Sequence, residues 1–190
     1  MTGVDPDTGL VLLAAGRSSR FGSDKFAASL DGKPLWRWAV TAADRAGFGR
    51  KFLVVRPDRL EMDPGEDWTM VVNHDADLGL SSSIKAGLHA AAHFPRIVLA
   101  LADMPFVTPG HLAAIAASPG VTFTRYLDGR DGCPAVFPSG SYHALLALSG
   151  DRGAASIQFG SSAAVAPADP AMLRDIDTVS DLAAAADPAA

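Results

Sequence analysis

The chain of 190 residues has the length of one domain, and its 48% hydrophobic content is enough for a full core. A formal net charge of −5 argues against a nucleic-acid partner, because such proteins carry a basic face. The single cysteine, Cys133, excludes an internal disulfide and is typical of a reducing cytoplasm. No apolar run approaches the length of a membrane span, and the polar residues 1–9 do not resemble a signal peptide. We therefore expect a cytoplasmic protein with one domain over 1–190 and with frayed or disordered ends at 1–8 and 187–190.

Apolar runs typical of strands alternate with amphipathic runs typical of helices along the chain. Pro34 and Gly47 bracket one such helix, and Ser81 can cap another. In chain order, we expect a buried strand at 10–14, a helix at 35–46, strands at 51–55 and 69–72, a helix beginning near Ser81, a strand at 96–101, a helix at 109–117, strands at 121–126 and 134–137, a short helix at 141–148, a strand at 173–176 and a final helix at 179–186. This order predicts an α/β fold with three layers, α/β/α, around a mostly parallel sheet.

The first expected strand opens at Gly16 into a polar loop that carries Arg17, Arg20 and Lys25. Glycine lets backbone N–H groups approach phosphate oxygens closely, while arginine and lysine neutralise the remaining charge. A Walker A loop does not fit, since Gly22 lies six positions after Gly16 and no lysine follows it directly. The G-x-G-x-x-G pattern of dinucleotide sites is also missing from this loop. The loop therefore predicts a phosphate site of a third kind.

Three aspartates lie at or just after the ends of two other expected strands. Asp103 comes at the end of the strand at 96–101, where it can hold Mg²⁺ together with phosphate oxygens, or serve as a turn residue before Pro105. Asp175 and Asp177 lie on one face of the expected strand at 173–176 and can share a site. Asp177 can instead cap the final helix. Because ligands bind beyond the carboxyl ends of strands in such sheets, we expect these residues and the Gly16 loop to meet.

Three consecutive serines lie between Gly79 and Gly87, where the start of a helix suits an anion or the edge of a base. The segment nearly matches the hydrolase elbow G-x-S-x-G, but Ser83 replaces the last glycine and no His–acid pair accompanies it. His89 and His93 are four residues apart, and we interpret them as a surface pair and not as a zinc site.

Residues 13–22, LAAGRSSRFG, with Lys25 resemble the L-A-A-G-x-S-x-R-[FM]-G-x-x-K motif of the nucleotidyltransferases. Among these the chain is most similar to the molybdenum cofactor cytidylyltransferases. Further segments that agree are GKPL at 32–35, GLSSSIKAGL at 79–88, LADMPF at 101–106, GDRGA at 150–154 and DIDTVSDL at 175–182. The resemblance spans residues 10–182 and implies a Rossmann-like, GT-A-like nucleotidyltransferase fold.

The resemblance implies transfer of a nucleoside monophosphate from a triphosphate to the phosphate of molybdopterin, with Mg²⁺ as cofactor and release of pyrophosphate. Ala15 stands where guanylyl-transferring relatives tend to carry glycine, which favours CTP over GTP. By position, the residues expected at the nucleotide are Ala14, Ala15, Gly16, Arg17, Ser82 and Ser83, the catalytic residues are Arg20, Lys25 and Asp103, and the metal ligands are Asp103 and Asp177.

This chemistry needs no strong general base, because an acceptor phosphate already carries an anionic oxygen. Positioned cations and Mg²⁺ stabilise the charge that develops on pyrophosphate. Cys133 stands where the family usually has histidine, and we interpret it as a turn or site-lining residue and not as a nucleophile. The identity of the acceptor therefore stays open, and a sugar or polyol phosphate is the alternative to molybdopterin. GTP is the alternative donor. A third alternative is a non-catalytic chaperone that binds a nucleotide or a cofactor. A molybdoenzyme or its maturation chaperone would be the protein partner.

Overall fold

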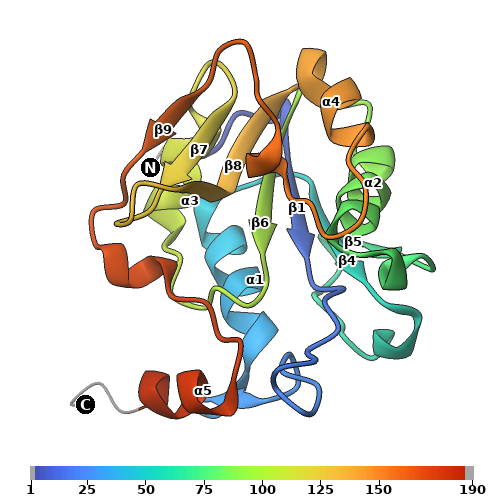
Figure 1. Ribbon diagram of the computed structural model, residues 1–190, viewed down its shortest axis with the longest axis vertical. Helices are drawn as coiled ribbons and strands as arrows, with labels where there is room; N and C mark the ends of the chain where they lie inside the picture. The colour runs from blue at the N-terminus through green and yellow to red at the C-terminus, as the bar shows by residue number, and fades with distance from the viewer. Residues whose placement is uncertain (1–2, 187–190) are drawn as a thin grey trace.

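The computed structural model describes residues 3–186 and is built around a seven-stranded sheet of order β5-β4-β1-β6-β8-β7-β9 (Figure 1). The strands are β1 (Thr8–Leu13), β2 (Ser29–Leu30), β3 (Lys33–Pro34), β4 (Lys51–Val55), β5 (Trp68–Val72), β6 (Arg96–Leu101), β7 (Thr122–Arg125), β8 (Asp131–Pro138) and β9 (Ala163–Val165). The α-helices are α1 (Leu35–Ala46), α2 (Leu80–Ala90), α3 (Pro109–Ala116), α4 (Tyr142–Leu146) and α5 (Val179–Ala186). Short 3-10 helices are η1 (Pro57–Arg59), η2 (Ala76–Leu78), η3 (Ser139–Ser141), η4 (Ala154–Ser156) and η5 (Pro170–Leu173). The strands β2 and β3 pair with each other outside the main sheet.

The sheet is mostly parallel. Strand β1 lies between β4 and β6 and runs parallel to both, so that Leu12 stands opposite Leu53 and Ala100. Strand β8 is the exception in the seven-stranded sheet, because it is antiparallel to both of its neighbours, β6 and β7. Helices α1 and α3 cover one face, and α2 and α4 cover the other (Figure 1). The predicted three-layer α/β/α class is therefore confirmed.

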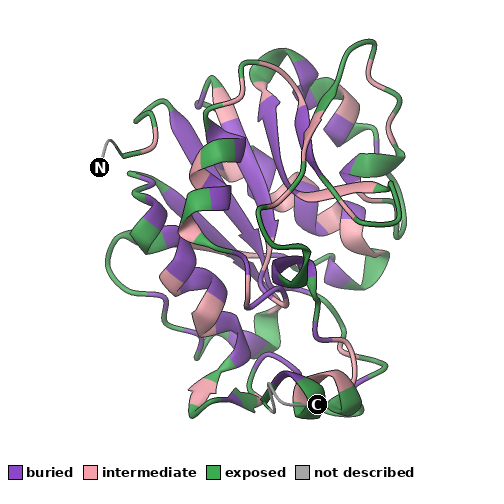
Figure 2. Cartoon of the chain, turned by 90° about the vertical axis from the view of Figure 1, so that its left-hand side faces the viewer, coloured by how far each residue is buried: buried purple, intermediate pink, exposed green. Residues whose placement is uncertain are grey.

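Burial of β1 on both faces explains its continuous apolar sequence. Leu10 and Leu12 pack into the cluster beneath α1 and α3, whereas Val11 and Leu13 pack into the cluster beneath α2 and α4. Figure 2 shows the central strands buried, with exposed residues on the outer sides of the helices. A strand covered on both faces has no solvent-facing positions, so it loses the alternation of apolar and polar residues seen in half-exposed strands. The polar loop that follows β1 is thereby anchored to the most buried part of the molecule.

The expectation of a strand at 173–176 is wrong. The helix η5 ends at Leu173, and the chain then joins no strand, although the N–H of Ile176 donates to the carbonyl of Asp103 at 2.9 Å. Ile176 is fully buried in a separate apolar cluster with Phe21 and Ala185. Ile176, the apolar residue that suggested a strand, therefore anchors helix α5 against the loop that follows β1. This cluster brings the C-terminal segment to the end of β6.

Two other local expectations also need correction. Ser81 does not cap α2, because the helix begins at Leu80 and its N-cap is Gly79, with a φ of 98° that favours glycine. The edge strand β9 was not expected, since its three residues Ala-Ala-Val are short and partly exposed. Of the ends expected to fray, residues 1–2 and 187–190 lie outside the described residues, and Thr8 is the first residue of β1. Within 3–186, no helix has both the length and the apolar character needed to cross a membrane.

Helix α2 packs on the sheet through Gly87. A Cβ atom at this position would overlap Cγ1 of Val11 and lie 3.0 Å from Cγ2 of Val54. We expect Gly87→Ala to lower the free energy of unfolding by about 1–2 kcal/mol, because overpacking outweighs the gain in helix propensity. Gly110→Ala in α3 is the matched control, since nothing lies within 4 Å of its Cβ position. Urea unfolding of both variants checks this, and equal stability of Gly87→Ala and Gly110→Ala would contradict the packing.

Candidate active site

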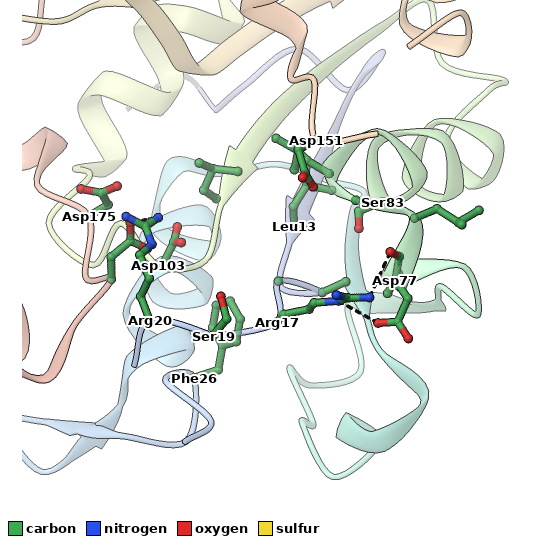
Figure 3. A pocket seen from close by; sticks show the side chains of 18 residues that line it. Leu13, Arg17, Ser19, Arg20, Phe26, Asp77, Ser83, Asp103, Asp151 and Asp175 are labelled. Carbon is green, nitrogen blue, oxygen red and sulfur yellow. Dashed lines mark hydrogen bonds and ion pairs between the residues drawn. The ribbon is translucent and has the colours of Figure 1, made fainter. Parts of the chain in front are cut away.

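A cavity of about 640 Å³ opens where β1 and β6 end. Its walls come from the loop after β1, the start of α2, the end of β6 and the segment before α5. Figure 3 shows Arg20, Asp103 and Asp175 on one side of the cavity and Arg17 reaching Asp77 on the other. The position agrees with the rule that ligands bind beyond the carboxyl ends of parallel strands.

Lys25 joins the two aspartates expected to hold metal. Its ammonium lies 2.6 Å from Oδ2 of Asp103 and 2.8 Å from Oδ1 of Asp177, and its side chain is only 7% exposed. Burial alone would lower the pKa of Lys25, but the charges and hydrogen bonds of Asp103 and Asp177 outweigh it and hold the pKa above its ordinary value. Lys25 is therefore a cation throughout the neutral pH range.

Asp103 and Asp177 offer carboxylate oxygens of the kind that hard divalent cations prefer. Oδ1 of Asp103 is buried and has no hydrogen-bond partner in the described chain, while Oδ2 of Asp177 binds Arg20 at 2.6 Å. Burial and the nearby charge of Asp177 raise the pKa of Asp175, which lines the same cavity. Over residues 3–186 no group of three metal-ligating side chains is already assembled. Two carboxylates suffice for Mg²⁺, which completes its shell with water and phosphate oxygens, so the residues fit this ion.

Asp177 is not the N-cap of α5. Oγ1 of Thr178 accepts from the N–H of Asp181 at 3.1 Å, and Oδ2 of Asp181 accepts from the N–H of Thr178 at 2.7 Å. This reciprocal pair is a capping box, with Thr178 in the capping position. The capping alternative for Asp177 is therefore wrong, and its carboxylate points to Lys25 and Arg20 instead.

The loop after β1 offers free backbone donors to the cavity. Ala15, Gly16 and Arg17 line the cavity, whereas Ala14 is fully buried beside it and does not. From Ala15 to Arg20, no backbone N–H donates to another residue of the described chain. Such a run of unpaired N–H groups is a typical anion-binding feature.

Arg17 does not bind Asp177, the aspartate that Arg20 and Lys25 share. Its guanidinium binds Asp77 at 3.0 Å, across the cavity, and its side chain is 60% exposed. Arg56 binds the same carboxylate at 2.9 Å, and hydrogen bonds from Arg56 and Arg17 lower the pKa of Asp77. The structure therefore places Arg20 and Arg17 in different parts of the cavity wall, and Lys25, which does not line the cavity, shares Asp177 with Arg20.

The two expected serines differ in position. Ser83 lines the cavity, and Ser82 lies beside it without lining it. Nδ2 of the buried Asn73 donates to Oγ of Ser82 at 2.9 Å and to Oγ of Ser83 at 3.1 Å. Asn73 therefore holds both hydroxyls in place. It was not predicted from the sequence, because it directly follows β5 and belongs to no recognisable motif. Asp151 in the cavity wall was missed as a site residue, although its segment, GDRGA, belongs to the resemblance.

Residues 10–165 match the family model described as the MobA-like NTP transferase domain. The chain belongs to this family. It is 29% identical over 186 residues to the purine catabolism protein PucB of Bacillus subtilis (strain 168), covering 88% of this chain and 90% of PucB. The family-model match over residues 10–165 includes every segment that resembles the nucleotidyltransferases except the one at 175–182. It confirms the resemblance at the level of the family.

Solved structures agree with this MobA-like assignment. A nucleotidyl transferase from Methanothermobacter thermautotroptrophicus, Mth528, superposes with a TM-score of 0.80 at 26% identity, over 92% of this chain and 93% of that one. Rv0371C from Mycobacterium tuberculosis H37Rv, solved in complex with manganese, gives a TM-score of 0.69 at 25% identity, over 97% and 98% of the two chains. The protein is therefore a nucleotidyltransferase that uses a nucleoside triphosphate, and one structurally similar protein has been solved with manganese.

A second cavity of this MobA-like transferase, of about 370 Å³, adjoins the first. The two share wall residues, among them Leu13, Leu80 and Asp175. Cys133 and Tyr126 line the second cavity, and the Tyr126 hydroxyl donates to the carbonyl of Cys133 at 2.9 Å. The two cavities are therefore neighbours that share part of their walls.

Cys133 is a neutral thiol in this structure. Burial, and to a smaller extent the charge of Asp103, raise its pKa to about 12. We expect iodoacetamide to label Cys133 in the folded protein far more slowly at pH 8 than in the unfolded protein, because the thiolate is the reactive form. Labelling followed by mass spectrometry checks this. A folded protein that reacts as fast as the unfolded one would show that the thiol is activated.

Proposed function

We propose that the protein transfers CMP from CTP to the phosphate of molybdopterin with the help of Mg²⁺. The observation that carries this proposal is the meeting of Arg20, Asp103 and Asp177 in one cavity, beside the free N–H groups of the loop after β1 and with the Lys25 ammonium bound to both aspartates. An oxygen of the acceptor phosphate bonds to the α-phosphorus, the bond to the bridging oxygen of the β-phosphate breaks, and pyrophosphate leaves with the electron pair. No proton has to be removed, because the attacking oxygen is already anionic.

Each charged residue then has a role. Arg20 and Lys25 bind the triphosphate and stabilise the charge that builds up on the leaving pyrophosphate. Asp103 and Asp177 would hold Mg²⁺, which when bound supplies positive charge at the phosphate oxygens. The buried, unpartnered Oδ1 of Asp103 supports a metal-binding role over a non-catalytic binding protein, since such an oxygen is costly without a ligand.

The second cavity suits the acceptor because it adjoins the first and shares the wall residue Asp175 with it. Its wall residue Cys133 stands where the resemblance leads one to expect histidine. This replacement favours a second candidate, transfer to another phosphate such as that of a sugar or polyol. Ala15 in the wall of the first cavity supports CTP over GTP, which is the alternative donor.

Pyrophosphate release tests the proposal. Purified protein is incubated with Mg²⁺, molybdopterin and one of CTP, GTP, ATP or UTP, and parallel reactions contain sugar or polyol phosphates in place of molybdopterin. We expect release with CTP and molybdopterin to exceed every other pair. Preference for another acceptor supports the second candidate, and release with GTP alone overturns the choice of donor. Silence with molybdopterin and all four nucleotides would reject the proposed reaction.

Asp103→Asn isolates the carboxylate in this reaction. We expect kcat to fall by about 100-fold or more, because the amide keeps the shape but loses the charge that holds the metal. Asp63→Asn is the matched control, since Asp63 is an exposed turn residue that accepts from the N–H of Gly65 at 2.9 Å. Steady-state kinetics of both variants decide the question. A kcat of Asp103→Asn within two-fold of that of Asp63→Asn would contradict the role of Asp103.

A further inference from the structure

Arg59, the last residue of η1, lies behind the loop that follows β1. It is only 5% exposed, does not line the cavity, and uses its whole guanidinium group in contacts. Nε and Nη2 each lie 3.0 Å from an oxygen of Asp24, so the pair is bidentate. The guanidinium also stacks over the ring of Phe26 at 4.9 Å.

Nη1 of Arg59 binds two carbonyls of the loop. It donates to the oxygen of Ala14 at 2.9 Å and to the oxygen of Gly16 at 2.8 Å. In a trans peptide the C=O of one residue and the N–H of the next point in opposite directions. The N–H groups of Ala15 and Arg17 therefore point away from Arg59, and both residues line the cavity. Arg59 thus holds two negative carbonyl ends away from the place where an anion would bind.

Ser18 connects this contact to Lys25. Ser18 has a φ of 55°, in the left-handed region that is uncommon for residues with a side chain. Its Oγ accepts from the N–H of Lys25 at 3.3 Å and lies 3.4 Å from Nη2 of Arg59. Strained backbone of this kind persists only where surrounding contacts hold it in place. The same arginine therefore supports both the loop backbone and the start of the segment that carries Lys25.

We propose that Arg59 is a positioning residue for the triphosphate. It acts through the loop and touches neither substrate, and it keeps the N–H groups of Ala15 and Arg17 turned toward the phosphates before the nucleotide arrives. Lysine cannot replace it fully, because a single ammonium lacks the planar fork that binds two carbonyls and a carboxylate at once. The inference rests on the proposed place of the nucleotide in the first cavity.

The test compares Arg59→Met and Arg59→Lys with Lys51→Met. Lys51 is a matched control because it is also a buried cation, 7% exposed, at the opposite end of β4. It binds Asp44 at 2.8 Å and lies over the ring of Trp68 at 5.5 Å. The readouts are kcat and KM for the nucleotide per folded protein, and calorimetric binding of inorganic tripolyphosphate with Mg²⁺, a probe that lacks the base.

We expect KM and the dissociation constant of tripolyphosphate to rise about tenfold in Arg59→Lys and further in Arg59→Met, because hydrogen bonds from a charged donor are lost. Lys51→Met lowers the melting temperature but leaves both constants unchanged. A purely structural role of Arg59 would lower the melting temperature of its variants in the same way and leave both constants within two-fold of wild type, which overturns the inference. If Arg59→Met does not fold, Arg59→Lys alone decides. Wild-type protein that binds neither nucleotide nor tripolyphosphate would instead refute the proposed site.

Discussion

One buried ammonium group joins three distant parts of the chain. Lys25 binds Asp103 and Asp177, which lie 78 and 152 residues away in the sequence. Without the lysine, two carboxylates would face each other in a partly buried space; without the carboxylates, a buried ammonium would be unpaired, and each state is costly. The three groups therefore require one another, and the first loop, the end of β6 and the segment before α5 are held in one arrangement.

This balance of charge matches the proposed substrate. A nucleotide with Mg²⁺ has one cationic and one anionic part; in the proposed reaction Asp103 and Asp177 would hold the metal, and Lys25 and Arg20 would bind the triphosphate. Such an exchange of partners would leave no buried group unpaired, which keeps its cost low. Ile176 supports this arrangement, because its N–H binds the Asp103 carbonyl and its side chain packs with the cluster beneath α5.

The sequence predicted the layers of the fold and the charged residues that gather at one edge of the sheet, because both depend on local signals. The apolar run of β1 and the loop with Arg20 and Lys25 are visible without any knowledge of distant contacts. Long-range contacts were not visible in this way. Arg59 and Asn73 belong to no motif, and their roles depend on what lies beside them in space. The strand expected at 173–176 failed for the same reason, because Ile176 serves a separate apolar cluster and not the sheet.

A crystal structure of the protein with Mn²⁺ and a non-hydrolysable CTP analogue would show whether the three charged groups exchange partners as proposed. Anomalous scattering locates the metal, and the refined side chains show where Lys25 lies. We expect manganese bound by Asp103 and Asp177, with the Lys25 ammonium on a phosphate oxygen. Manganese bound elsewhere, with Lys25 still between the two aspartates and the nucleotide outside the first cavity, would contradict this proposal.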